Sequence, residues 1–262
     1  MEMTFKQYID NPMGKRNAVF SQRDLFKSLY TEKFDKIFLR EAGKINYTLY
    51  HDKNSDRYII HLKIPSETVR EFYYDAIIMF YTDSAEKRSS TSLQDYFVKF
   101  FSNDPAFVFT YLRVFLKNDL FFEDLKPKSS KLALKEDPKI KNPYEIPGYS
   151  KILYFAYIFM TMKNLFNKNM FISYGEQYSK NKLLNNVMHT DDKISLRQEL
   201  GEKQRKQDAV KERQKENRAR DIGAVSDMIK LSPDAKKVKN TKTTGLVKTT
   251  STTKRTKIIK KK

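Results

Sequence analysis

The sequence predicts an α+β fold, in which a small antiparallel sheet is followed by packed helices, a solvated helix and a disordered basic tail. Two observations lead to this prediction. All 16 Tyr and 19 Phe lie at or before Tyr178, so only the first part of the chain can build a large core. Within that part, an early segment alternates apolar and polar residues, whereas later segments place apolar residues at helical spacing.

The strand prediction starts with a hairpin over residues 45–64. Its second run, 57–64, alternates in period two, and five turn-forming residues, Asp52 to Asp56, separate it from the first run. Strand parity places His61 opposite Leu62, on a face that we expect to be solvated. Residues 74–81 suit a third strand. Because Ser66 and Glu67 could also cap a helix, residues 66–81 stay open between helix and strand, and we favour a short helix that passes into a strand.

The helix predictions rest on capping residues followed by apolar spacing. Asp104 before Pro105 is typical of a helix start, and Gly148 to Ser150 lead into the apolar run from Ile152 to Met160. That run is too short to span a bilayer and is interpreted as a buried helix. The helices expected in the body are Ser21–Leu39, one around Leu93, Phe97, Phe100 and Phe101, one from Pro105 to Lys117, Ser130–Lys135, Lys151–Phe166, and a shorter one ending near 186.

Charge divides the chain into parts. The whole chain has 51 Lys plus Arg and 32 Asp plus Glu, a net charge of +19, and from Thr190 onward there are 22 basic and 10 acidic residues. We therefore predict a globular domain over 1–186, a charged solvent-exposed helix over 190–222 and a disordered basic tail over 223–262. Limited proteolysis is expected to leave a core that ends between about 180 and 192.

The basic tail is the candidate nucleic-acid site. Positive charges on a segment without aromatic residues can follow DNA or RNA phosphates without reading sequence, although a solubilising role or an acidic protein partner also fits. The eleven candidate residues are Lys236, Lys237, Lys239, Lys242, Lys248, Lys254, Arg255, Lys257, Lys260, Lys261 and Lys262.

Other patterns favour ordinary structural roles over catalysis. Glu67, Glu71 and Asp75, or Asp119, Glu123 and Asp124 with Lys126, could in principle hold a nuclease metal, but a solvated face explains them better. The Asp52–Asp56 run resembles half of a calcium loop, yet Arg57 and Lys63 occupy the positions that need Gly and Glu. The histidines His51, His61 and His189 are scattered. We therefore expect no catalytic residue, no metal and no cofactor.

The chain has no cysteine, which excludes disulfides and thiolate sites, and its first residues do not form a signal peptide. We therefore expect no membrane span and no secretion through a signal peptide.

In composition, and in its layout of a body plus a basic tail, the chain resembles the Lys-, Asn-, Phe- and Tyr-rich structural proteins of tailed bacteriophages of AT-rich hosts. The resemblance implies a non-enzymatic virion component of the head, neck or core, with other structural proteins as partners. The expected location is then the virion or the cytoplasm of the infected cell. The alternatives are a nucleic-acid-binding replication or transcription factor and, third, a metal-dependent nuclease.

Overall fold

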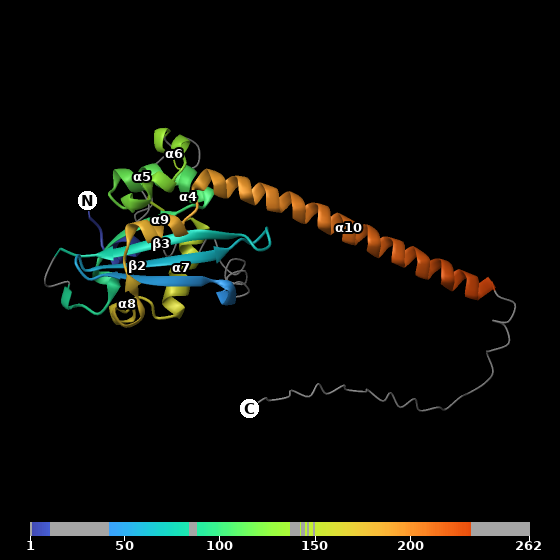
Figure 1. Ribbon diagram of the computed structural model, residues 1–262, viewed down its shortest axis with the longest axis horizontal. Helices are drawn as coiled ribbons and strands as arrows, with labels where there is room; N and C mark the ends of the chain where they lie inside the picture. The colour runs from blue at the N-terminus through green and yellow to red at the C-terminus, as the bar shows by residue number, and fades with distance from the viewer. Residues whose placement is uncertain are drawn as a thin grey trace, which may run out of the picture. The chain divides into compact units, whose positions relative to one another are not determined.

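A five-stranded mixed sheet forms the centre of the body in the computed structural model (Figure 1). The structure describes residues 2–10, 42–83, 88–136, 142, 145, 147–148 and 150–231, with side chains up to residue 222. The strand order is β4-β3-β2-β1-β5, antiparallel except for the parallel pair of β1 and β5. The strands are β1 (Asn46–Asp52), β2 (Arg57–Pro65), β3 (Tyr73–Tyr81), β4 (Phe97–Ser102) and β5 (Glu176–Gln177).

The predicted hairpin is confirmed. Strands β1 and β2 pair from Asn46 opposite Lys63 to Asp52 opposite Arg57. The turn is closed by the Asp52 carboxylate, which accepts a hydrogen bond from the Asn54 N–H at 3.1 Å. The turn residues therefore serve the backbone, as the composition of the loop predicts.

The third strand is confirmed, but the short helix expected before it is wrong. Ser66 does act as a local cap, because its hydroxyl accepts hydrogen bonds from the N–H groups of Thr68 and Val69 at 3.4 and 3.3 Å. The chain then turns at Glu71, whose φ of 58° lies in the left-handed region, and enters β3 at Tyr73. A right-handed helix cannot continue through such a residue.

The helix expected around Phe97 is also wrong, since these residues form β4. Phe100 and Phe101 pair with Ile78 and Ile77 of β3. Leu93 belongs to a separate 3₁₀ turn, η2, so the spacing that suggested one helix joins two different elements. The alternation of half-buried Phe97 and Lys99 with buried Val98 and Phe100 is the pattern that a strand requires.

Both edges of the sheet are partly covered by other segments. At the β4 edge, the N–H of Val98 donates to the carbonyl of Met3 and that of Phe100 donates to the carbonyl of Leu120, at 3.1 and 2.7 Å. At the β1 edge, β5 pairs with Tyr50 and His51. Covered edges offer few free backbone groups to another chain.

Helices surround the sheet, and Figure 1 shows α4, α5 and α6 grouped on one side and α8 on the other. The predicted cap is confirmed for α4, where Asp104 accepts from two backbone N–H groups, and in α7 the Ser150 hydroxyl accepts from the N–H of Leu153. The predicted Ser21–Leu39 helix lies outside the described residues. The helices are α1 (Phe5–Asp10), α4 (Pro105–Thr110), α5 (Leu112–Lys117), α6 (Lys131–Lys135), α7 (Lys151–Met162), α8 (Lys168–Tyr174), α9 (Lys180–Asn186) and α10 (Thr190–Leu231), with 3₁₀ turns η1 (Ala42–Lys44), η2 (Leu93–Asp95) and η3 (Glu123–Lys128).

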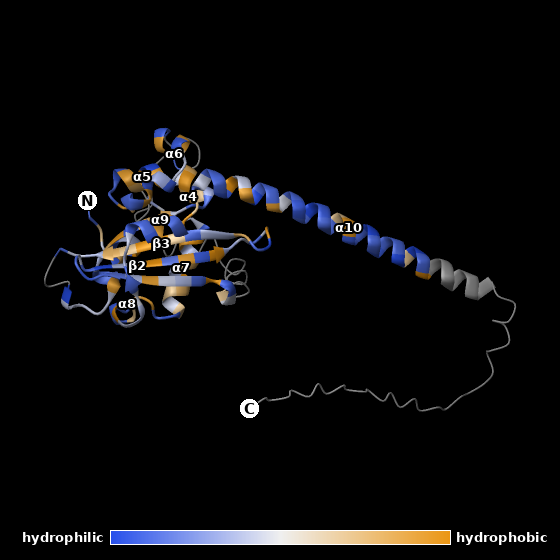
Figure 2. Ribbon diagram, in the orientation of Figure 1, coloured by the Kyte–Doolittle hydropathy of each residue, from blue (hydrophilic) through white to orange (hydrophobic). Residues whose placement is uncertain are grey.

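The core lies on both faces of β2 and β3, whose residues are almost all buried. On one face, Phe80 and Phe100 contact the ring of Phe5, with centroids 5.6 and 6.1 Å apart. On the other face, Phe101 packs edge-on against Phe121 at 6.1 Å. Figure 2 shows hydrophobic residues concentrated along these strands, whereas α10 is mainly hydrophilic.

The predicted solvated helix is present as α10, but its first turns are not solvated. Thr190 and Lys193 are buried, and Leu196 and Leu200 pack against the core. Two apolar residues four positions apart are too few for a coiled-coil repeat, yet they suffice to hold a few turns on the body. The chain divides into two units between residues 207 and 208, inside α10.

Candidate functional site

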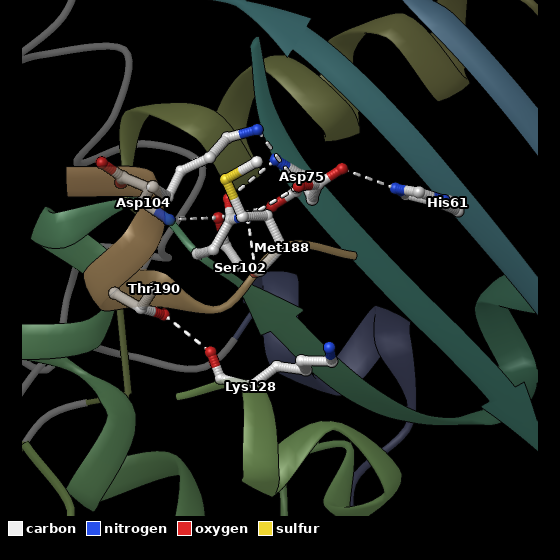
Figure 3. A network of polar contacts seen from close by, with 9 residues as sticks. His61, Asp75, Ser102, Asp104, Lys128, Met188 and Thr190 are labelled. Atoms are coloured by element: carbon white, nitrogen blue, oxygen red, sulfur yellow. Dashed lines mark hydrogen bonds and ion pairs between the residues drawn. The ribbon is translucent and has the colours of Figure 1, made fainter. Parts of the chain in front are cut away.

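A buried polar network joins the sheet to the start of α10 (Figure 3). We call it the Asp75 network and define it by His61 of β2, Asp75 of β3, Asn103 after β4 and Lys193 of α10. His61 and Asp75 have exposed fractions of only 3% and 2%. The sequence places these residues together because His61 and Asp75 have the same strand parity, and Asn103 follows the strand that pairs with β3.

The carboxylate of Asp75 is the centre of the network. One oxygen lies 2.8 Å from Nε2 of His61, and the other accepts a hydrogen bond from the Asn103 side-chain amide at 2.6 Å. The ammonium group of Lys193 lies 3.5 Å from this second oxygen and 5.1 Å from the centre of the Phe72 ring. The Asn103 amide oxygen accepts from the backbone N–H of Asp75 at 2.8 Å, which fixes the position of both residues.

The charges in the network favour the ionised carboxylate. Burial alone would raise the pKa of Asp75, but the hydrogen bond and charge of His61, the charge of Lys193 and the Asn103 amide outweigh it, and the pKa lies below its ordinary value. Removing one partner from a buried ion pair of this kind is costly, because the other charge then stays buried without compensation.

The network also holds the backbone that leads into α10. The Asn103 amide donates to the carbonyl of Met188 at 3.3 Å, and the hydroxyl of Thr190 donates to the carbonyl of Lys128 at 3.0 Å. Figure 3 shows these bonds beside Asp75. The first residue of α10 is therefore tied to η3, and the residues before it are tied to the end of β4.

Beyond Lys193, one side of α10 follows the loop that precedes β3. Arg197 donates to the Thr68 hydroxyl at 3.2 Å, and Gln204 accepts from the Arg70 N–H at 2.9 Å. Gly201, between them, lies against the side chain of Val69. Spacings of three, four and seven residues place these contacts on one face of the helix.

This arrangement suits attachment of a helix better than catalysis. A His beside an Asp is a common general-base pair, but catalysis needs a reacting group within hydrogen-bond reach of the base. Side chains with exposed fractions of 3% and 2% offer no such access unless α10 moves away. The Asp75 network therefore fastens α10 to the sheet.

The expectation that His61 lies on a solvated face is wrong. Parity places His61 opposite Leu62 correctly, but the segment around Met188 and Lys193 covers that face. A sheet with cover on both faces has no solvated side in its centre.

The two carboxylate clusters that could have held a nuclease metal are not assembled. Glu67 pairs with Lys151 at 2.9 Å, and Asp75 is in the buried network. In the second cluster, Asp119 pairs with Lys99, and Asp124 accepts from Tyr178 and pairs with Lys180. Among the described residues, no three His, Asp or Glu side chains lie together as possible metal ligands.

The other two histidines lie in separate surroundings. His51 stacks on Tyr58 with ring centroids 4.8 Å apart, and burial lowers its pKa. His189 accepts a hydrogen bond from the N–H of Asp191 at 3.2 Å, just before α10. Neither histidine contacts Asp75.

The eleven predicted nucleic-acid-binding residues, from Lys236 to Lys262, lie outside the described residues, and their role stays a prediction. Within the described part of the chain, no helix is long and apolar enough to cross a membrane.

Sequence reasoning missed Lys193 and Arg197, which were included only in the solvated helix. The available signal is the stripe of Leu196 and Leu200, which favours contact of this side of the helix with the body. The comparisons add no further assignment, because no family model matches this chain and no curated protein or solved structure gives a significant match.

Proposed function

We propose that the protein is a non-enzymatic structural or assembly protein that contacts nucleic acid without sequence preference through its basic C-terminal tail. The observation that carries this proposal is the separation of charge along the chain. Residues 236–262 contain 11 basic residues and no acidic residue. Such a segment gains binding energy by releasing the counterions that surround DNA or RNA.

The body differs from the tail because many of its lysines have acidic partners. Lys99 pairs with Asp119 at 2.8 Å, and Lys180 pairs with Asp124 at 2.7 Å. Paired lysines neutralise their partners locally and leave less net charge for a phosphate chain. The tail has no acidic residue that could do this, so the tail rather than the body is the expected site of phosphate contact.

The attachment of α10 to the body explains how the basic tail could be held near the body. The Asp75 network and the contacts of Arg197 and Gln204 hold the first turns of α10 on the body. The chain after α10 leads to the basic tail, so a body bound within an assembly would keep the tail tethered to it. More specifically, we propose that the protein is a virion component that lies near packaged nucleic acid.

The test is a salt titration of binding to labelled duplex DNA, measured by fluorescence anisotropy. Deletion of Lys236–Lys262 should remove most of the affinity. If about six tail charges contact phosphates, the log–log slope of affinity against salt should be roughly −5 for the full chain and shallower for the truncated chain.

A matched control replaces the 11 tail Lys and Arg residues with Gln and keeps the length of the tail. This variant should bind as weakly as the truncated chain, because charge and not length supplies the affinity. Equal affinity of all three proteins would show that the tail is a solubiliser. A strong preference for one duplex sequence would instead favour the replication or transcription factor.

The virion assignment has its own test, which is mass spectrometry of purified particles. Detection of the chain at a constant copy number supports it, and absence from the particles contradicts it.

A further inference from the structure

A cavity of about 320 Å³ lies beside the first turns of α10, where the loop before β3 and the N-terminus of α7 meet. It shares no lining residue with the Asp75 network. The polar residues that line it are Ser66, Glu67, Thr68, Tyr74, Asp104, Lys151 and Arg197.

A buried hydrogen-bond donor on this cavity, Nε of Arg197, has no acceptor. The guanidinium group of Arg197 donates from Nη2 to the Thr68 hydroxyl at 3.2 Å, but its Nε is buried without a hydrogen-bond partner. Tyr74, with an exposed fraction of only 9%, lines the same cavity. Buried donors are almost always satisfied in folded proteins, so the buried Nε beside this cavity indicates a missing acceptor.

An anionic acceptor suits the Arg197 guanidinium group and the N-terminus of α7, which both lie at this cavity. Lys151 is the first residue of α7, a helix of 12 residues whose N-terminus carries partial positive charge. Burial raises the pKa of Tyr74 to about 12, so its hydroxyl keeps the proton that it can donate.

The two acidic residues on the cavity are already engaged. Glu67 pairs with Lys151 at 2.9 Å. The Asp104 carboxyl accepts from the N–H groups of Ala106 and Phe107, both at 3.3 Å, and burial raises its pKa. Neither carboxyl bonds to Arg197 Nε or to the Tyr74 hydroxyl, which therefore remain available to a ligand.

We propose that this cavity binds a small oxyanion of the phosphate type, held by Arg197 and the Tyr74 hydroxyl and attracted by Lys151. Arginine presents its donors in a planar fork that matches phosphate oxygens, and the hydroxyl and ammonium groups approach from other elements. Arg197 belongs to α10 and Tyr74 to β3, so the bound anion bridges the helix and the sheet. Binding therefore stabilises the attached state of the first turns of α10.

The test is a calorimetric titration of the full chain with sodium phosphate, with sodium chloride of equal ionic strength as the reference. Sulfate and acetate distinguish a tetrahedral oxyanion from a carboxylate. Tyr74→Phe and Arg197→Gln should each weaken phosphate binding about ten-fold, because each removes a hydrogen bond to a charged ligand. The matched controls are Tyr73→Phe, next to Tyr74 at the start of β3, and Arg213→Gln, in the exposed part of α10.

Saturable phosphate binding that is weakened by the two cavity variants and not by the two controls supports the proposal. Hydrogen exchange should then also slow in residues 190–204 when phosphate is added. Tyr74→Phe keeps the buried ring, so its circular dichroism should match that of the wild type even if Arg197→Gln loosens the helix. Binding no stronger than that of chloride, or equal binding by all variants, overturns the proposal and leaves a cavity that holds only water.

Discussion

Replacement of Asp75 with Asn tests whether the Asp75 network fastens α10 to the body. The change keeps the shape of the side chain and removes its charge. The ammonium group of Lys193, 3.5 Å away and in a residue with an exposed fraction of 9%, then has no counter-charge. The new side-chain NH2 group would also place a donor where the carboxylate now accepts hydrogen bonds from the Asn103 amide or faces the His61 ring.

The structure allows a rough magnitude. Loss of a hydrogen bond to a charged group costs about 1.5–3 kcal/mol, and leaving a buried ion without its partner costs about 3–5 kcal/mol. Because both effects concern the same carboxylate they do not add, and we expect Asp75→Asn to lower the free energy of unfolding by about 3–5 kcal/mol. Lys193→Met should cost only about 1–2 kcal/mol, since Asp75 keeps His61 and Asn103.

Urea denaturation followed by circular dichroism measures both changes, and tyrosine fluorescence provides a second probe in a chain without Trp. Lys203→Met is the matched control. It breaks an ion pair with Glu199 in which both side chains are at least 60% exposed, so it should leave the urea midpoint almost unchanged. The double variant of Asp75 and Lys193 should cost less than the sum of the single variants. If Asp75→Asn stays within about 0.5 kcal/mol of the wild type, the network does not fasten the helix.

The remaining predictions concern the helix, the acid response and the extent of the body. Gly201→Ala should stabilise the protein by about 0.5–1 kcal/mol in the same urea assay, because the new methyl would meet Val69 at an ordinary 3.7 Å; destabilisation would show that the helix lies closer to the body. Because the pKa of Asp75 is lowered, its contribution is complete above the ordinary value of 3.8 and is lost as the pH falls through the lower folded value. Burial raises the pKa of Asp104, so the protonated carboxyl favours the folded state. This contribution to stability is lost as the pH rises from 3.8 through the raised value. Asp104→Asn keeps the helix cap but cannot ionise, so its stability should not fall over this pH range. Urea midpoints measured between about pH 3 and 6 test both the Asp75 and the Asp104 predictions. Because the first turns of α10 are attached, limited trypsin digestion should leave a fragment that ends beyond Gln204 and not between about 180 and 192, as the composition alone predicts; a stable fragment ending before Thr190 would contradict the attachment of α10.

The sequence predicted the local parts of the fold because each has its own short-range signal. The 45–64 hairpin has period-two alternation and a run of turn residues, and the Asp104 cap directly precedes its helix. The prediction for strand β4 was wrong because Leu93, Phe97, Phe100 and Phe101 satisfy helical spacing. Pairing with β3 decides the conformation of this segment. Tertiary pairing of this kind can override local propensity.

The Asp75 network could not be predicted because its members meet only through the tertiary fold. Asn103 and Met188, which share a hydrogen bond, are 85 residues apart in the sequence. His61 and Asp75 alone have the parity of one sheet face, but nothing in their neighbourhood says that a later helix will cover it. Arg197 and Tyr74, which share the cavity, are separated in the same way.

The pairing of β1 with β5 has a consequence for the order in which the chain can fold. Tyr50 and His51 find their parallel partners only at Glu176 and Gln177, so strands β1 to β4 leave the ribosome long before the edge of β1 is closed. Closing a loop of this length early is entropically unfavourable, and such non-local pairs form slowly. During synthesis, the nascent sheet therefore presents an open strand to its neighbours. When β5 forms, it covers the Tyr50–His51 part of this edge.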